Sequence, residues 1–100
     1  MQTKLINRDD KAVIVLEGRF DFNAYREFRE AVDQALKEAG REIQVDLGAV
    51  DYLDSSALGM LLMLRDKAKG AAKEVALANA RGSVKQVIDI ANFGKLFTLV

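Results

Sequence analysis

The sequence predicts an α/β fold in which a mixed, mostly parallel β-sheet carries helices mainly on one face. Segments with an alternating or continuous apolar pattern take turns along the chain with segments whose apolar residues recur at helical spacing. Strands that are joined through a helix pair in parallel, because only a crossover of that length returns the chain to the same end of the sheet. Half of the 100 residues are apolar, which is enough for one core, so residues 1–100 are predicted to form a single domain.

The first part of the chain predicts a hairpin followed by an amphipathic helix. Thr3 to Asn7 and Lys11 to Glu17 read as strands, and the aspartates between them favour a turn. Asn23 is a plausible helix cap and Gly40 a stop. The apolar residues between them that follow helical spacing are Ala24, Phe28, Ala31, Val32, Ala35, Leu36 and Ala39.

The second part repeats the alternation of strand and helix. A strand is predicted from Glu42 to Leu47, a helix from Ser55 to about Lys69, and a strand from Glu74 to Ala78. Ser83 with Gln86 reads as a capping box that starts a short third helix. Residues 96–100 read either as a last strand, which is favoured, or as a truncated piece of a longer end. The residues expected to be buried are Val13, Val15, Phe28, Val32, Val45, Leu61 and Val75.

Composition excludes several classes of function. Fifteen basic and fifteen acidic residues are interspersed along the chain, so no basic stripe is available for a nucleic acid. The absence of cysteine and histidine removes disulfides, thiolate nucleophiles and most zinc sites, and no metal or cofactor is expected. The apolar runs are shorter than the roughly 20 residues of a membrane span, and no signal segment precedes them. We therefore expect a cytoplasmic protein that binds neither nucleic acid nor membrane.

The most informative segment is Asp54-Ser55-Ser56, which lies between a predicted strand and a predicted helix. Unpaired backbone N–H groups and the positive end of the helix dipole meet at such a position, which favours a phosphate group. From the residues alone, Ser55 fits a capping residue best, in a position that is also favourable for a phosphate. Asp54 fits an N-cap role, a role in kinase recognition, or both, and Ser56 fits a structural hydroxyl better than a second acceptor.

The helix that follows contains more apolar residues than one sheet contact needs. Met60 and Met63 read either as core filling or as the apolar part of a partner-binding surface next to Ser55, since thioether side chains adapt to varied surfaces. In the second interpretation Arg65 and Lys67 frame that surface.

An enzyme is the main rival class, and the sequence does not favour it. A serine nucleophile needs a base within hydrogen-bond reach, and without histidine the candidates are lysines or aspartates at spacings that match no known template. We therefore expect no enzymatic activity.

The segment Asp54-Ser55-Ser56-Ala57-Leu58-Gly59 resembles the D-S-S-x-L-G signature of the STAS family, the fold of bacterial anti-sigma factor antagonists. Leu16 to Asp21 resembles the family's strand that ends in glycine with an aspartate three residues later. Leu77 to Asn79 and Ile90 to Phe97 resemble its fourth strand, its third helix and the following turn. The resemblance covers nearly the whole chain and implies the STAS fold. It is nearest to the stand-alone antagonists of partner-switching pathways.

This resemblance implies a phosphoswitch in signal transduction and transcription regulation. The family's phosphoacceptor corresponds to Ser55, with Ser56 as the alternative, and Asp21 matches a position beside the acceptor. The unphosphorylated form is expected to bind a serine kinase or anti-sigma factor with a histidine-kinase-like ATP fold, and phosphorylation ends that binding. A metal-dependent serine phosphatase is expected to reverse the modification.

Two functional alternatives remain open within the same resemblance. The chain could be a structural STAS module of a transporter or of a stress-sensing assembly, which binds proteins without a phosphoswitch. The output of a partner switch could be a sigma factor or a regulator of secretion, motility or biofilm formation.

Overall fold

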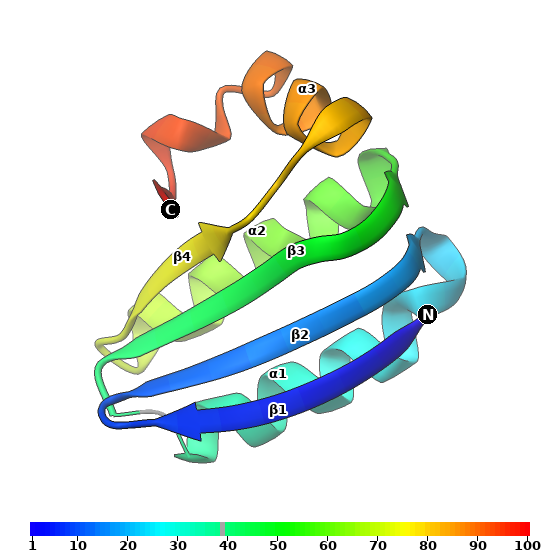
Figure 1. Ribbon diagram of the computed structural model, residues 1–100. Helices are drawn as coiled ribbons and strands as arrows, with labels where there is room; N and C mark the ends of the chain where they lie inside the picture. Colours follow the sequence, from blue (N-terminus) through cyan, green and yellow to red (C-terminus); the bar gives the residue numbers. More distant parts are fainter. Residues whose placement is uncertain (39) are drawn as a thin grey trace.

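A computed structural model describes residues 1–38 and 40–100 of the chain and shows a five-stranded sheet in the order β1-β2-β3-β4-β5 (Figure 1). The strands are β1 (Gln2–Arg8), β2 (Lys11–Phe20), β3 (Glu42–Leu53), β4 (Glu74–Ala78) and β5 (Thr98–Leu99). The helices are α1 (Tyr25–Glu38), α2 (Ser55–Gly70) and α3 (Gly82–Ile90), with two 3₁₀ turns, η1 (Phe22–Ala24) and η2 (Phe93–Lys95).

The sheet has the predicted mixed topology. β1 and β2 form an antiparallel hairpin, and Asp9 takes the left-handed conformation that its turn requires, with φ 52°. β2, β3, β4 and β5 pair in parallel, because a helical crossover joins each strand to the next. Figure 1 shows α1 and α2 side by side on one face of the sheet, while α3 lies beyond the end of β4. The predicted fold class is confirmed.

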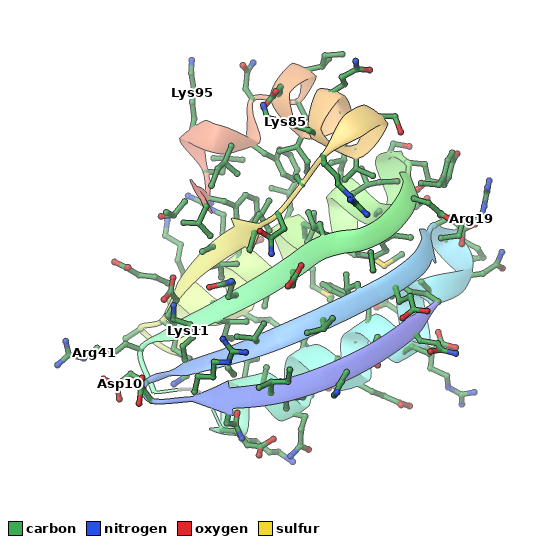
Figure 2. All side chains as sticks on the ribbon, in the orientation of Figure 1. Asp10, Lys11, Arg19, Arg41, Lys85 and Lys95 are labelled. Carbon is green, nitrogen blue, oxygen red and sulfur yellow. The ribbon has the colours of Figure 1, made fainter. Side chains whose placement is uncertain are left out.

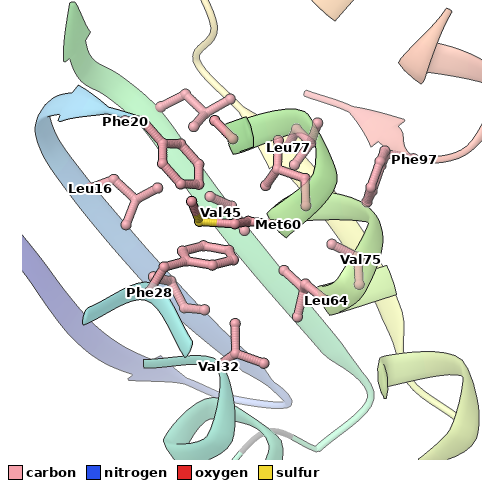
Figure 3. Packing of buried hydrophobic residues seen from close by; sticks show 14 of the residues in the cluster. Leu16, Phe20, Phe28, Val32, Val45, Met60, Leu64, Val75, Leu77 and Phe97 are labelled. Atoms are coloured by element: carbon pink, nitrogen blue, oxygen red, sulfur yellow. The ribbon is translucent and has the colours of Figure 1, made fainter. Parts of the chain in front are cut away.

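The core lies between the sheet and the two helices, as Figure 3 shows. All but one of the residues that were expected to be buried are buried, namely Val13, Phe28, Val32, Val45, Leu61 and Val75. The prediction for Val15 is wrong, since this side chain is only half-buried. In β2 the side chains of Ile14 and Leu16 belong to the core, so the alternation of the strand turns Val13 and Val15 toward the face without helices.

Two predicted helix starts differ from the structure. The residue that caps η1 before α1 is Asp21, whose carboxylate accepts a hydrogen bond from the Asn23 backbone N–H at 3.0 Å, so Asn23 is not the cap. The predicted capping box is also wrong, because α3 begins at Gly82 and Ser83 already lies inside the helix. Gly82 has a φ of 58°, which glycine tolerates and which allows the helix to begin before the serine.

The C-terminal strand is shorter than predicted, and Leu96 and Phe97 lie in a turn rather than in β5. Phe97 is buried against Phe93, with 5.2 Å between the ring centroids. Its apolar side chain therefore belongs to the core, although the residue is not part of a strand. β3 is longer than predicted because its C-terminal half, to Leu53, pairs with the long strand β2. Ala39, the last member of the predicted helical series, lies outside the described residues.

Candidate functional site

The parallel register of β2 and β3 brings the candidate residues to one edge of the sheet. Phe20 and Leu53 are directly paired, so the residues that follow them, Asp21 and Asp54, leave the sheet at the same end. Figure 2 shows Arg19 at this end, while Asp10 and Lys11 mark the opposite end. We call this end, where η1 and α2 begin, the switch edge.

Asp54 is the N-cap of α2. Its Oδ1 accepts a hydrogen bond from the Ala57 backbone N–H at 3.1 Å, and its backbone oxygen accepts one from Leu58 N–H at 3.1 Å. This confirms the capping role, while a role of Asp54 in kinase recognition stays a prediction. Because the aspartate caps the helix, neither serine is needed for that purpose.

Removal of this cap should have a measurable but moderate effect. Asp54→Ala is expected to lower the free energy of unfolding by about 1 kcal/mol, because the Ala57 N–H loses its acceptor. Asp51→Ala is the matched control: its side chain is exposed, and its loss is expected to stay within about 0.5 kcal/mol. Urea denaturation of the parent and both variants measures the difference, and equal losses would contradict the capping role.

Ser55 and Ser56 are both exposed in the first turn of α2. Within the part of the chain that the structure describes, neither hydroxyl forms a hydrogen bond to another residue. Both hydroxyls are therefore open to solvent, next to the unpaired N–H groups and the positive dipole of the helix start. A phosphate on either serine would meet a favourable local field.

Asp21 is fully engaged by its neighbours. One carboxylate oxygen accepts the Asn23 N–H, and the other lies 2.9 Å from Nε of Arg19. Arg19 in turn stacks on the ring of Tyr52, with its guanidinium carbon 3.8 Å from the ring centroid. Asp21 therefore ties the end of β2 to the end of β3 through Arg19, and its role beside the phosphoacceptor stays a prediction.

Three exposed aromatic side chains at the switch edge were not among the predicted site residues. Phe22, Tyr25 and Tyr52 are exposed at 73%, 43% and 38%, respectively. A signal was present, because Phe22 lies between the predicted strand and the apolar series of the predicted helix and belongs to neither pattern.

Met60 does not form part of an exposed surface. Its side chain is only 5% exposed, and Figure 3 shows it beside the rings of Phe20 and Phe28, which lie 5.0 Å apart. The partner-binding interpretation is thus wrong for Met60, because this position of α2 faces the sheet, and core filling is the correct one. Met63 is half-buried and packs against the edge of the core, so part of it stays accessible.

The different burial of the two methionines leads to a stability prediction. Met60→Ala is expected to lower the free energy of unfolding by about 2 to 5 kcal/mol, since it removes a side chain that fills the space beside two aromatic rings. Met63→Ala should cost clearly less, because part of its side chain already contacts solvent. Urea denaturation compares the two variants, and a loss below about 1 kcal/mol at Met60 would contradict its place in the core.

Arg65 and Lys67 do not frame a common surface with Ser55. Nε of Arg65 donates to the backbone oxygen of Leu96 at 3.0 Å, whereas Nζ of Lys67 pairs with Asp33 of α1 at 3.3 Å. They therefore reach toward opposite sides of α2, and Arg65 lies about 15 Å along the helix from Ser55, at about 1.5 Å per residue. These contacts do not test partner binding, so the role of Arg65 and Lys67 at a partner-binding surface stays a prediction.

Within residues 1–38 and 40–100, no group of three or more acidic side chains is placed to hold a metal ion. No helix in the described ranges is long and apolar enough to cross a membrane.

The family of this chain is established by its similarity to known proteins. The family model described as Mlab, STAS domain, matches residues 5–100. The chain belongs to the STAS family. A STAS-domain containing protein of Pseudomonas aeruginosa (strain UCBPP-PA14) is 45% identical over 86 residues, which cover 86% of this chain and 84% of that protein.

Solved structures of other proteins share the fold. The unphosphorylated anti-sigma factor antagonist SpoIIAA superposes with a TM-score of 0.82 at 22% identity, covering 99% of this chain and 88% of SpoIIAA. An anti-sigma factor antagonist from Mycobacterium paratuberculosis gives 0.85 at 22% identity, with 98% and 83% covered. A sulfate transporter family protein from Wolinella succinogenes gives 0.75 at 11% identity, with 90% and 73% covered. The chain thus has a STAS fold similar to that of anti-sigma factor antagonists.

Proposed function

We propose that this STAS protein is a phosphoswitch of the anti-sigma factor antagonist kind. Its unphosphorylated form binds a serine kinase or anti-sigma factor, and phosphorylation of Ser55 ends that binding. The observation that carries the proposal is the exposed hydroxyl of Ser55 in the first turn of α2, on a helix that Asp54 already caps. A serine that is exposed and not used in capping is free to accept a phosphate. This holds for Ser55 and Ser56 alike, and Ser55 is chosen because it holds the place of the acceptor in the D-S-S-x-L-G signature.

The local electrostatics favour a switch that leaves the fold intact. A phosphate adds roughly 1.5 to 2 negative charges, and the positive end of α2 accommodates this charge. A partner surface packed against a neutral hydroxyl would instead have to meet a buried anion. Like charges or unpaired charges at an interface cost several kcal/mol, and about 1.4 kcal/mol already lowers affinity tenfold. A conformational change is therefore not needed.

The acceptor is tested by mapping the phosphate. Incubated with ATP and an extract of the cells from which it comes, the protein should gain a single phosphate on Ser55, as read by peptide mass spectrometry. Ser55→Ala should abolish the gain, while the matched variant Ser56→Ala, in the same helix turn, should retain most of it. A phosphate found on Ser56, or on neither serine, would contradict the assignment.

A second function deserves the same test, because the fold also occurs in a sulfate transporter family protein. In that alternative the chain is a structural module of a transporter or of a stress-sensing assembly and binds its partner without modification. Ser55 would then stay unphosphorylated in protein isolated from its native cells.

The proposed phosphoswitch involves two cytoplasmic partners. One is an ATP-dependent kinase with a histidine-kinase-like fold, and the other is a metal-dependent serine phosphatase. In this proposal the chain itself is not an enzyme.

A further inference from the structure

A hollow of about 410 Å³ lies at the edge of the sheet, beside the start of β4. Its walls come from segments that are far apart in the sequence, namely the C-terminal half of α2, residues 73–75 and residues 94–98. The two residues of β5 pair with Ala76 and Leu77, so β5 does not reach the first residues of β4. The volume lies within the range of about 300 to 1,000 Å³ that is typical of binding sites for small molecules.

This hollow is basic, although the chain as a whole has no net charge. The basic residues that line it are Arg65, Lys69, Lys73 and Lys95, and the one acidic residue is Glu74. In the described part of the chain, Arg65, Lys69 and Lys95 form no ion pair, so no neighbour neutralises their charges. We call the site lined by these four basic residues the basic hollow.

The helix dipole explains only part of this charge. Lys69 lies in the last turn of α2, where a cation interacts favourably with the negative end of the helix. Lys67 lies in the same turn, but it pairs with Asp33 on α1 and does not line the hollow. Arg65 lies one turn earlier, and Lys95 belongs to η2. The fold therefore gathers cations that no single helix end requires.

Arg65 is held in place before any ligand binds. Its Nε donates a hydrogen bond to the backbone oxygen of Leu96 at 3.0 Å, which ties α2 to the opposite wall of the hollow. The terminal nitrogens of the guanidinium do not take part in this bond, and their forked N–H groups match the oxygens of a phosphate. Lys69 and Lys95 are exposed, and Figure 2 shows Lys95 extended into solvent, so these flexible side chains are able to turn toward a bound anion.

We propose that the basic hollow binds a small polyanion that carries two or more phosphate groups. Several positive charges around one concave space attract clustered negative charges more strongly than a single one. The concave shape suits a small ligand, because a membrane or a nucleic acid would need a broader basic surface. Lys69 lies about 21 Å along α2 from Ser55, at about 1.5 Å per residue, so this site is separate from the proposed phosphoswitch.

The test is calorimetric titration of the whole protein with inorganic tripolyphosphate at low ionic strength, where charges are weakly screened. Lys69→Gln is expected to weaken binding at least fivefold, because it removes one of the positive charges around the ligand. Glu74→Gln is expected to strengthen binding at least twofold, because it removes the carboxylate that repels the ligand, and a gain of affinity does not arise from unfolding. Lys4→Gln is the matched control, since it removes an exposed lysine from β1 at the opposite edge of the sheet.

NMR spectra recorded during the same titration locate the site. Shifts of the backbone amide signals should concentrate in residues 65–75 and 94–98. A concentration of shifts at Ser55 and Ser56 would mean that the polyanion binds the start of α2, and it would overturn the basic hollow. None of these results depends on whether Ser55 becomes phosphorylated, so the proposed function is tested separately.

Three further results would overturn the proposal. The first is the absence of binding heat at millimolar tripolyphosphate. The second is an equal loss of affinity in Lys4→Gln and Lys69→Gln, which would show that the polyanion binds surface lysines in general. The third is binding to vesicles of phosphatidylcholine and phosphatidylglycerol without binding to tripolyphosphate, which would indicate a membrane contact in place of a small-ligand site.

Discussion

Ser55→Asp is expected to bind the partner kinase at least tenfold more weakly than the parent while it folds with nearly the same stability. The carboxylate lies in the first turn of α2, where a negative charge typically contributes about 0.3 to 1 kcal/mol in favour of the helix, and the adjacent Asp54 offsets part of this. The same charge would be buried at the docked interface against a surface that fits a neutral hydroxyl. The cost therefore falls on binding and not on folding.

Titration calorimetry of the parent, the variant and the phosphoprotein tests this expectation. Ser55→Ala is the matched control and should bind about as well as the parent, because it removes the acceptor without adding charge. The phosphoprotein should bind more weakly than Ser55→Asp, since phosphate carries more charge than a carboxylate. Equal affinities in all four proteins would refute the charge switch. A weaker affinity that is matched by a large fall in melting temperature would mean that misfolding was being measured.

Phe28→Ala is expected to cause the largest loss of stability, about 3 to 5 kcal/mol in the free energy of unfolding. The ring of Phe28 is completely buried between α1 and the sheet, and its centroid lies 5.0 Å from that of Phe20. Truncation would leave a cavity in a core of close-packed side chains that can collapse only in part. Because domains of this size are stable by only about 5 to 15 kcal/mol, the variant would lose a large share of its stability.

Phe22→Ala provides the matched control for this prediction, because it makes the same change on an exposed ring six positions earlier in the sequence. It should change the free energy of unfolding by no more than about 0.5 kcal/mol. Chemical denaturation followed by circular dichroism gives both values. Similar losses at Phe22 and Phe28 would show that burial does not separate the two positions as the structure indicates.

The local pattern of the chain was sufficient to predict which strands and helices form and in what order, but not where each of them begins and ends. Apolar alternation in β2 and β3 and helical spacing in α1 depend on neighbours within one element, so they can be read without knowledge of the fold. The order of these elements then limits the topology, because a helix between two strands requires parallel pairing. Asp54 as a helix cap belongs to the same class, since it acts only on the N–H groups of its own first turn.

Other features depend on what the chain meets after it has folded. Met60 is buried because α2 packs on the sheet with this side of the helix. The apolar character of the residue alone does not distinguish a core position from an exposed one. Arg65 and Lys67 are two residues apart and therefore point about 200° apart around the helix, but only the fold shows that one meets Leu96 and the other Asp33. Val15 is half-buried because all the packed helices lie on the other face of β2.

The order of strands and helices and the start of α2 after Asp54 can be read from the amino-acid sequence, because they depend on apolar spacing and on contacts within one element. The residues that surround Ser55 depend instead on how the elements pack. The register of β2 against β3 brings Arg19 over Tyr52 and places Asp21 and Phe22 at the edge that carries Ser55, although more than 30 residues separate the two segments. A contact of that kind is set by strand pairing across the sheet, and no local pattern in either segment encodes it.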